Sequence, residues 1–320
     1  MFERDTPRRT VSRRTVIKAS GAALAAAAVP TVAAAGDDWT VAEAPTENTL
    51  YDVQTTAAGA YAVGGGGIVV ERTSEGWRKT LDGGPTGNGN DLYGAGVTDD
   101  GKRLWFVGAS GAIGEYDVTT GDLNDYSAPM DVTNNFNDIA VTGEAGSANV
   151  YVAGDSGKLY HSFENGEAGS WDDVTPASGS NINAVDFFDG RKGHIVDGNQ
   201  TVLYTQDGTT WDKLGIEDAD YNFYGVDSDG FDDVTVAGGG GSVYRWNGSE
   251  WARRDTGDAD LRDLERGGSG GLTVGAGGTV AARDGDRWVV EETPTGENLR
   301  AVVRGEVDVA VGASGTVIER

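Results

Sequence analysis

Residues 36–320 repeat one pattern of hydrophobic and polar positions seven times. Each copy opens with an apolar residue, then any residue, then a small or acidic residue, then a second apolar residue. These openings begin at Leu50, Leu92, Phe136, Ile182, Phe223, Leu261 and Leu299. Successive openings lie 38 to 46 residues apart, a period typical of repeat architectures in which each copy is one supersecondary unit.

Every opening leads into an apolar strand. In six copies this strand ends at a Gly-x-x-Gly turn, as at residues 64–67, whereas the fourth copy has a different turn at 197–200. A second apolar strand follows, and in most copies a tryptophan then opens a last strand: Trp77, Trp171, Trp211, Trp251 and Trp288. Short strands, glycine-rich turns and no helical periodicity predict an all-β fold, a seven-bladed β-propeller of four-stranded antiparallel blades.

The two ends of the repeat region complement each other. The seventh copy stops at Arg320 after three strands, and a spare tryptophan-containing segment surrounds Trp39. We therefore expect the N-terminal strand around Trp39 to complete the last blade, because a closed ring hides strand edges that would otherwise be exposed. The alternative is six complete blades with loose ends.

The first 35 residues have the layout of a targeting segment. A basic start is followed by an alanine-rich apolar run and then by small residues at 33–35. Within it, Arg13 and Arg14 belong to a Ser-Arg-Arg-Thr-Val-Ile-Lys sequence that matches a twin-arginine signal. We predict a signal peptide over 1–35 and a propeller over 36–320, exported and either extracellular or associated with the cell envelope. The apolar run is too short to favour a permanent transmembrane helix.

The chain is strongly acidic, with 51 acidic and 25 basic residues and a net charge of −26. Aspartates are dispersed along it and lysine is scarce, which indicates a surface adapted to concentrated salt rather than a store for cations. So anionic a chain has no general affinity for nucleic acid or anionic membranes. The absence of cysteine excludes disulfides, thiolate metal sites and cysteine nucleophiles, and two histidines are too few for a multi-histidine metal centre. No cofactor and no metal are expected.

The repeat motifs resemble those of a known family. Residues 205–211, with Asp207, Gly208 and Trp211, are similar to the Asp box of neuraminidase-type (BNR) repeats, and weaker copies occur at 283–288 and 246–251. Together with the Leu-x-x-Val and Val-Gly-x-x-Gly motifs, they resemble BNR-like propellers related to the photosystem II stability and assembly factor. The resemblance implies that the Asp box is a structural turn remote from any active site. The residues agree, because aspartate caps such a turn, glycine takes its left-handed position and tryptophan packs between blades.

Candidate binding residues occupy the second position of each opening. Propeller ligands usually meet the mouth of the central channel, where the inner strands begin and the Gly-x-x-Gly turns lie. The ring at this position is Tyr51, Tyr93, Asn137, Asn183, Tyr224, Arg262 and Arg300. Arginine suits carboxylate or phosphate, and tyrosine joins an apolar ring to a polar tip. The hypothesis is an anionic or extended peptide-like ligand with Arg262 and Arg300 as charge partners. The alternative is that these arginines form salt bridges with Asp263 and Asp308 and that the ring residues fill the channel.

Other conspicuous residues have structural interpretations. An Asn or Asp precedes almost every opening, which indicates a turn-capping role: Asn48, Asn90, Asn134, Asn181, Asn222, Asp260 and Asn298. The acidic segment 227–233 superficially resembles a calcium loop but lacks the distal glutamate, and we interpret it as a hairpin turn. His161 and His194 lie in predicted strands with no serine partner that the sequence can place, so a hydrolytic triad has no support.

These observations favour a non-catalytic binding or assembly module that presents a loop face to a protein, a peptide or an anionic ligand outside the cytoplasm. An alternative is an extracytoplasmic glycan hydrolase or lyase of the sialidase-like propeller type. It would need three arginines around one channel-mouth carboxylate, and the sequence does not reproduce that catalytic set. A second alternative is a structural component of the envelope.

Overall fold

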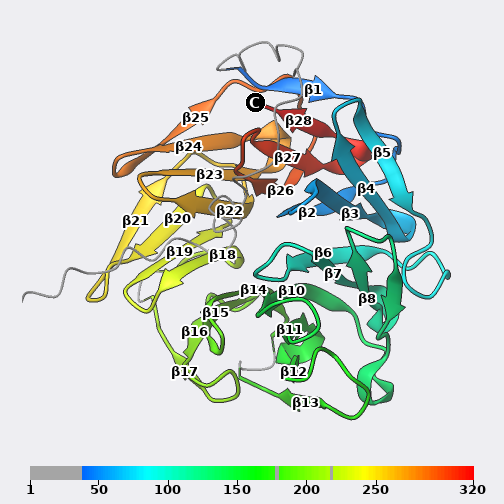
Figure 1. Ribbon diagram of the computed structural model, residues 1–320. Helices are drawn as coiled ribbons and strands as arrows, with labels where there is room; N and C mark the ends of the chain where they lie inside the picture. Colours follow the sequence, from blue (N-terminus) through cyan, green and yellow to red (C-terminus); the bar gives the residue numbers. More distant parts are fainter. Residues whose placement is uncertain (1–37, 177–179, 217–218) are drawn as a thin grey trace, which may run out of the picture.

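The computed structural model describes residues 38–176, 180–216 and 219–320, and they form a ring of seven four-stranded antiparallel sheets (Figure 1). The seven-bladed propeller and its four-stranded blades are therefore confirmed. The predicted signal segment, with Arg13 and Arg14, lies outside the described residues. Among those described, no helix is long and apolar enough to cross a membrane.

Each blade runs outward from an innermost strand. Blade 1 is β2 (Leu50–Thr56), β3 (Gly59–Gly64), β4 (Ile68–Thr73) and β5 (Gly76–Leu81). Blade 2 is β6 (Leu92–Val97), β7 (Arg103–Gly108), β8 (Ile113–Asp117) and β9 (Leu123–Asp125). Blade 3 is β10 (Phe136–Thr142), β11 (Asn149–Gly154), β12 (Leu159–Ser162) and β13 (Trp171–Val174). Blade 4 is β14 (Ile182–Asp189), β15 (Lys192–Asp197), β16 (Val202–Thr205) and β17 (Trp211–Lys213).

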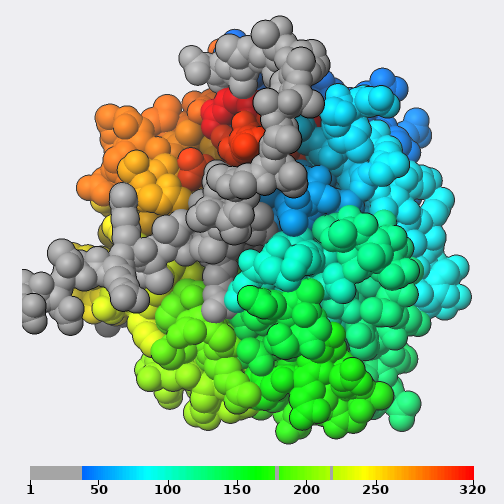
Figure 2. All heavy atoms as spheres, in the orientation of Figure 1, coloured from blue at the N-terminus to red at the C-terminus, as the bar shows by residue number. Residues whose placement is uncertain are grey.

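The remaining blades complete the circle. Blade 5 is β18 (Phe223–Gly230), β19 (Asp233–Gly238), β20 (Ser242–Trp246) and β21 (Trp251–Asp255). Blade 6 is β22 (Leu261–Gly267), β23 (Gly270–Gly275), β24 (Val280–Asp284) and β25 (Arg287–Glu291). Blade 7 is β26 (Leu299–Val303), β27 (Val309–Gly312), β28 (Val317–Glu319) and β1 (Thr40–Ala42). Figure 2 shows the blades as successive sectors, with the colour advancing around the ring.

The predicted closure of the last blade is confirmed. β1 pairs antiparallel with β28, with Thr40 opposite Glu319 and Ala42 opposite Val317. Polar contacts then join this blade to both neighbours. The Glu319 carboxylate accepts hydrogen bonds from Trp77 Nε1 of blade 1 at 2.7 Å and from Arg72 Nε at 2.9 Å. On the other side, Trp39 Nε1 donates to Glu291 of blade 6 at 2.8 Å.

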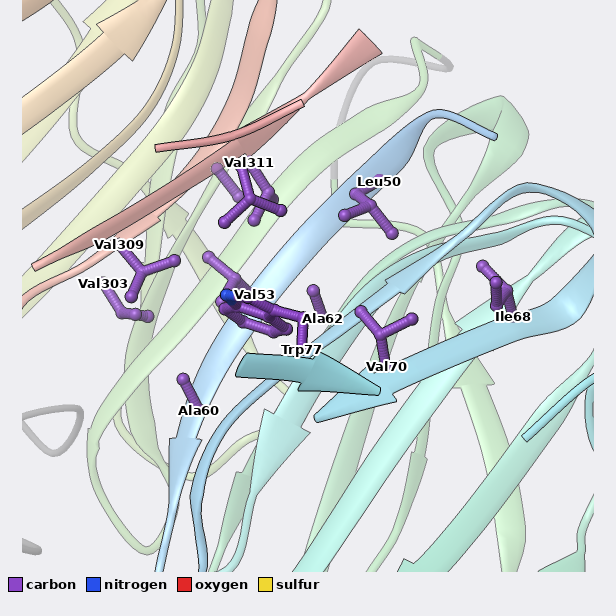
Figure 3. Packing of buried hydrophobic residues seen from close by; sticks show 12 residues of the cluster. Leu50, Val53, Ala60, Ala62, Ile68, Val70, Trp77, Val303, Val309 and Val311 are labelled. Carbon is purple, nitrogen blue, oxygen red and sulfur yellow. The ribbon is translucent and has the colours of Figure 1, made fainter. Parts of the chain in front are cut away.

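A separate hydrophobic cluster fills each of the seven interfaces between blades. At the interface between blades 7 and 1, Val303, Val309 and Val311 face Val53 and Trp77 (Figure 3). The other six clusters lie in the same way between consecutive blades. Because one blade buries its two faces only against its neighbours, burial of apolar area couples the stability of each blade to the next.

The turns between the second and third strands lie on the face where the inner strands begin, as predicted. Five are short 3-10 turns: η2 (Gly65–Gly67), η3 (Ala109–Gly111), η5 (Asp155–Gly157), η6 (Ala276–Gly278) and η7 (Ala313–Gly315). In every blade an N–H near the start of this turn donates to the carbonyl of the residue just before that blade's inner strand, as Ala109 does to Asp91 at 2.8 Å. The middle residues of the 3-10 turns have positive φ, which glycine tolerates best.

The capping role predicted for Asn and Asp residues needs a correction of position. The residue directly before the inner strand accepts, through its side-chain oxygen, the N–H of the middle turn residue of the preceding blade. Five junctions have this bond, with acceptors Asp91, Asn135, Asn181, Asp260 and Asn298. In blades 2 and 3 the acceptor is therefore Asp91 or Asn135, one residue after the predicted Asn90 and Asn134. This bond links neighbouring blades, whereas the predicted Asn48 caps the turn of its own blade, because its Nδ2 donates to the carbonyl of Gly65 at 2.8 Å.

Buried carboxylates also join the inner strands. Asp52 accepts the N–H of Val53 at 2.7 Å through Oδ1 and the N–H of Ala95, in the next blade, at 2.7 Å through Oδ2. Equivalent bonds run from Val185 to Asp138 at 2.8 Å and from Val302 to Asp263 at 2.9 Å. The blade that follows each of these aspartates has Gly94, Ala184 or Ala301 at the same position of the opening. This explains why the third position is either acidic or small.

Replacing Asp52 with Asn tests these bonds. The amide that replaces one carboxylate oxygen faces a backbone N–H, so a buried donor loses its acceptor. We expect the free energy of unfolding to fall by about 2 kcal/mol, measured by urea unfolding at fixed salt. Asp258→Asn, at an exposed position, is the matched control and should change it by less than about 0.5 kcal/mol. Equal effects of the two substitutions would contradict a structural role for the carboxylate.

Candidate functional site

The channel mouth contains all seven predicted ring residues. Tyr51, Tyr93, Asn137, Asn183, Tyr224, Arg262 and Arg300 line one cavity of about 250 Å³. Each is the second residue of an inner strand, so the repeat places one side chain per blade at the same height. The geometry that the sequence predicted is therefore present, whereas the binding role of these residues stays a prediction.

The ring is chemically asymmetric. On one side Tyr51 and Tyr93 meet edge to face, with ring centroids 5.2 Å apart. Burial, followed by the nearby Asp91 carboxylate, raises the pKa of Tyr93, so its phenol stays protonated. Next to this pair stand the two arginines of blades 6 and 7. The Arg262 guanidinium lies 4.2 Å from the Tyr224 ring centroid, and that of Arg300 lies 6.0 Å from the Tyr51 ring centroid.

The two asparagines occupy the other side of the ring, in blades 3 and 4. Asn137 Nδ2 donates to the carbonyl of Ile182 at 3.1 Å, and Asn183 Nδ2 donates to the carbonyl of Phe223 at 2.6 Å. Each amide thus bridges to the following blade through its nitrogen. Within the described part of the chain its oxygen accepts no hydrogen bond, which leaves an acceptor for the N–H of a ligand.

Among the described residues, no salt bridge joins Arg262 or Arg300 to Asp263 or Asp308, the partners that the alternative interpretation gave them. Arg262 Nη2 lies 3.3 Å from Asp260, a partly exposed pair, whereas Asp308 pairs with Arg320 at 3.1 Å. Arg300 has no carboxylate within 4.0 Å among the described residues, and its buried Nε has no hydrogen-bond partner there. A guanidinium in this state is a donor without an acceptor, which an anionic ligand would supply.

Sequence reasoning missed the aspartates that line the same cavity. Asp52, Asp138 and Asp263 are at its wall, and their carboxylates hold backbone N–H groups of the next blade. Their signal in the sequence was the acidic third position of the opening. Because backbone N–H groups occupy them, these carboxylates serve the ring structure and are poorly suited to general acid or base chemistry.

The Asp207–Gly208 turn at the outer edge of blade 4 is structural. Asp207 Oδ1 accepts the N–H groups of Thr209 at 2.8 Å and Thr210 at 2.7 Å, and Gly208 has a φ of 80°. These bonds lower the pKa of Asp207 well below its usual range. The predicted aspartate cap and left-handed glycine are both present, and Trp211 packs against the cluster between blades 3 and 4.

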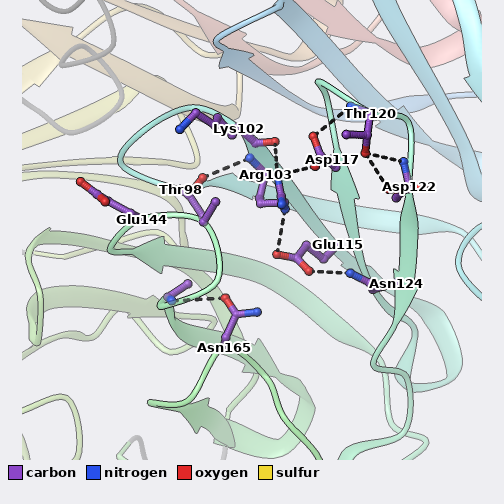
Figure 4. Close-up of polar contacts among 12 residues, drawn as sticks. Thr98, Lys102, Arg103, Glu115, Asp117, Thr120, Asp122, Asn124, Glu144 and Asn165 are labelled. Carbon is purple, nitrogen blue, oxygen red and sulfur yellow. Dashed lines mark hydrogen bonds and ion pairs between the residues drawn. The ribbon is translucent and has the colours of Figure 1, made fainter.

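Blade 2 builds a related outer turn from a different sequence. Asp117 Oδ1 accepts the N–H groups of Thr119 at 2.8 Å and Thr120 at 3.1 Å. Arg103 extends the network by pairing with Asp117 at 2.7 Å and Glu115 at 3.6 Å (Figure 4). The charge of this arginine is paired with two carboxylates of its own blade.

His194 has a serine partner that the sequence could not place. Its Nδ1 lies 2.7 Å from Ser228 Oγ, across the interface between blades 4 and 5. Both side chains are almost completely buried, and burial lowers the pKa of His194 to about 3. A substrate cannot reach this pair, so its role is packing. The segment 227–233 forms the hairpin between β18 and β19, as predicted, and the described residues contain no group of three or more His, Asp or Glu side chains placed to hold a metal.

No protein-family model matches the chain, and no curated protein matches it significantly in sequence. Solved structures match its fold. YCF48 from Cyanidioschyzon merolae superposes with a TM-score of 0.68 at 15% identity, over 88% of this chain and 98% of that chain. YCF48 bound to D1 peptide gives 0.68 at 14% identity, over 92% and 99%.

An enzyme is among the similar structures as well. A catalytically inactive variant of virginiamycin B lyase from Staphylococcus aureus, with quinupristin, gives a TM-score of 0.73 at 13% identity, over 88% of this chain and 98% of that chain. The chain is thus similar in fold to seven-bladed propellers that include the photosystem II assembly factor type, in agreement with the repeat motifs. At these identities the similarity shows the fold alone.

The pKa of His194 can be measured directly, because the chain has only two histidines. The buried imidazole should stay neutral in NMR titrations from pH 7.5 to 5, with His161→Gln used for assignment. An unfolded chain binds a proton at this residue near pH 6.5, so folding loses stability as the pH falls below 6.5, by about 1 to 2 kcal/mol at pH 5. Asp229 has the opposite effect: its pKa in the folded protein is raised to about 6, so its protonation adds stability to the folded state as the pH falls. A titration midpoint near 6.5 would mean that solvent reaches His194.

Proposed function

We propose that the protein is a non-catalytic binding or assembly propeller whose channel mouth binds an extended peptide through an anionic group. The observation that carries this proposal is the convergence of the seven ring residues on one cavity, with Arg262 and Arg300 side by side in an otherwise acidic chain. Both guanidiniums lie near tyrosine rings, which restrict their orientation.

The layout of the ring suits a peptide. A carboxylate would meet Arg262 and Arg300, with the phenols of Tyr51 and Tyr224 beside it. Backbone N–H groups farther along the ligand would meet the amide oxygens of Asn137 and Asn183 across the cavity. The cavity of about 250 Å³ holds a few residues of an extended chain rather than a folded domain, so a protein partner would insert a terminus or a loop.

A similar propeller gives independent support, because YCF48 has been solved bound to D1 peptide. The sialidase-like alternative is less well supported. It needs three arginines around one channel-mouth carboxylate, whereas two line the cavity among the described residues. We further propose, from the sequence of residues 1–35 and the dispersed acidity, that this propeller is exported by the twin-arginine route and works outside the cytoplasm in concentrated salt.

Peptides that differ only at the C-terminus test the proposal. The probes are ten-residue extended peptides with a free carboxylate, compared with the same peptides carrying a C-terminal amide. Calorimetry on the full chain should show tighter binding of the carboxylate form. Arg262→Ala with Arg300→Ala should weaken that binding at least about ten-fold, because charge-assisted hydrogen bonds are lost.

The matched control removes two arginines outside the cavity, Arg253 and Arg287, by substitution with Ala. It changes the net charge by the same amount and should leave binding unchanged. Equal binding of the carboxylate and amide peptides, or equal loss in both double variants, would overturn the proposed role of the mouth.

A further inference from the structure

The interface between blades 5 and 6 differs from the other six. Among the described residues its hydrophobic cluster has four buried members, Ala237, Val243, Leu261 and Leu264, whereas the other clusters have eight to twelve. Beside this small cluster lies a cleft of about 260 Å³ whose lining includes four arginines: Arg245, Arg254, Arg266 and Arg283. Charged side chains therefore occupy the space that apolar side chains fill elsewhere in the ring.

Arg266 is one charged residue at a position that is apolar in other blades. It is the sixth residue of its inner strand, a position held by Val141 in blade 3 and Phe187 in blade 4, both in hydrophobic clusters. Its side chain is 3% exposed. Nη1 donates to Asp233 at 2.6 Å and to Thr235 Oγ1 at 3.1 Å, while the buried Nε has no partner in the described structure.

The interfaces between blades 7 and 1 and between blades 6 and 7 contain a group that the cleft does not show. At each, an arginine at the end of the third strand and the tryptophan opposite it hold one carboxylate of the preceding blade. Arg72 and Trp77 of blade 1 bind Glu319 of blade 7. Arg320 and Trp39 of blade 7 bind Glu291 of blade 6, with Arg320 Nη1 2.6 Å from the carboxylate. Each Arg–Trp pair is thus satisfied by an acid built into the neighbouring blade.

Blade 6 has the same pair, but no described carboxylate forms a hydrogen bond or salt bridge with it. Arg283 lies opposite Trp288 in the register of β24 and β25, as Arg72 lies opposite Trp77 in β4 and β5. The residue of blade 5 equivalent to Glu319 is Arg245, since each lies two residues after the valine paired with the second strand. The position that holds a carboxylate at the interface between blades 7 and 1 therefore holds a guanidinium at the interface between blades 5 and 6.

Arg283 is influenced by the neighbouring guanidiniums, in a cleft whose lining also includes Glu250 and Asp286. Its Nη1 is buried without a hydrogen-bond partner among the described residues. Burial, followed by the charges of Arg266 and Arg245, lowers its pKa below the usual arginine value. Arg245 is held by Asp233 at 3.2 Å, and Arg254 donates to the backbone carbonyl of Asp286 at 2.7 Å.

We propose that the cleft between blades 5 and 6 binds an oxyanion group, a carboxylate or a phosphate, between Arg283, Arg245 and Trp288. The bound oxyanion takes the place that Glu319 occupies between blades 7 and 1. Guanidinium forks and an indole N–H are donors well matched to such a group. This site is distinct from the channel mouth and shares no lining residue with it.

The indole signals of the tryptophans report on the site directly. In 1H–15N spectra of the full chain, the Trp288 Nε1 signal, assigned with Trp288→Phe, should shift saturably on titration with acetate or inorganic phosphate at constant ionic strength. The signals of Trp77 and Trp39 should not move, because each is already bound to a carboxylate of the chain. Comparison of the two probes distinguishes a carboxylate site from a phosphate site.

Arg283→Gln should weaken this binding at least about ten-fold. Arg287→Gln, on the same hairpin but exposed and paired with Asp284 at 3.4 Å, is the matched control and should bind as the unmodified chain does. Unshifted Trp77 and Trp39 signals verify that each variant is folded. A Trp288 signal that stays fixed with both probes, or binding that survives in Arg283→Gln, would overturn the proposal and would mean that Glu250 or Asp286 at the cleft satisfies the arginine.

Discussion

The ring is closed by the pairing of the first strand of the propeller with the last, three residues of each. Strand β1 contributes Thr40–Ala42 to the blade that ends with β28. This pairing is non-local, so chain entropy opposes it until the intervening blades are formed. Glu319 and Trp39 then fix the closed blade to blades 1 and 6 through hydrogen bonds. The channel mouth exists only while the ring is closed, because its lining comes from all seven blades.

The acidity of the chain has an internal role beside its effect on the surface. Carboxylates such as those of Asp52, Asp138 and Asp263 hold backbone N–H groups of the following blade at the wall of the channel. They thereby set the spacing of the inner strands and the positions of the ring side chains above them. The same principle of an acid from one blade held by donors of the next recurs at the outer edge, where Glu319 and Glu291 serve Arg–Trp pairs. The interface between blades 5 and 6 differs, because there the equivalent Arg–Trp pair is held by no described carboxylate of the preceding blade.

Most features that could be predicted, namely the number of blades, their closure and the ring residues, follow from the position of each residue in the repeat. A period near 40 residues, a last copy that is one strand short and a spare strand around Trp39 are enough to predict seven blades and their closure, since the hydrophobic pattern specifies which strands must be covered. The same register placed all seven ring residues on one cavity. Contacts between blades could not be predicted from the repeat register. Asp91, next to the predicted capping residue, accepts the N–H of Gly66 from the preceding blade, and Ser228 meets His194 across an interface. Such contacts depend on how neighbouring sheets stagger, which one repeat does not encode.

A cross-link between the two ends of the chain tests the closed ring most directly. The chain has no cysteine, so a pair introduced by Ala42→Cys and Val317→Cys, which lie opposite each other, is free of competing thiols. The closed ring predicts that mild oxidation forms this disulfide quantitatively in the folded full chain and raises its resistance to unfolding, whereas two cysteines introduced at the distant positions Ala42 and Asp258 stay reduced. Failure of the Ala42–Val317 pair to cross-link, or equal cross-linking of both pairs, would contradict closure by β1 and with it the shared channel mouth.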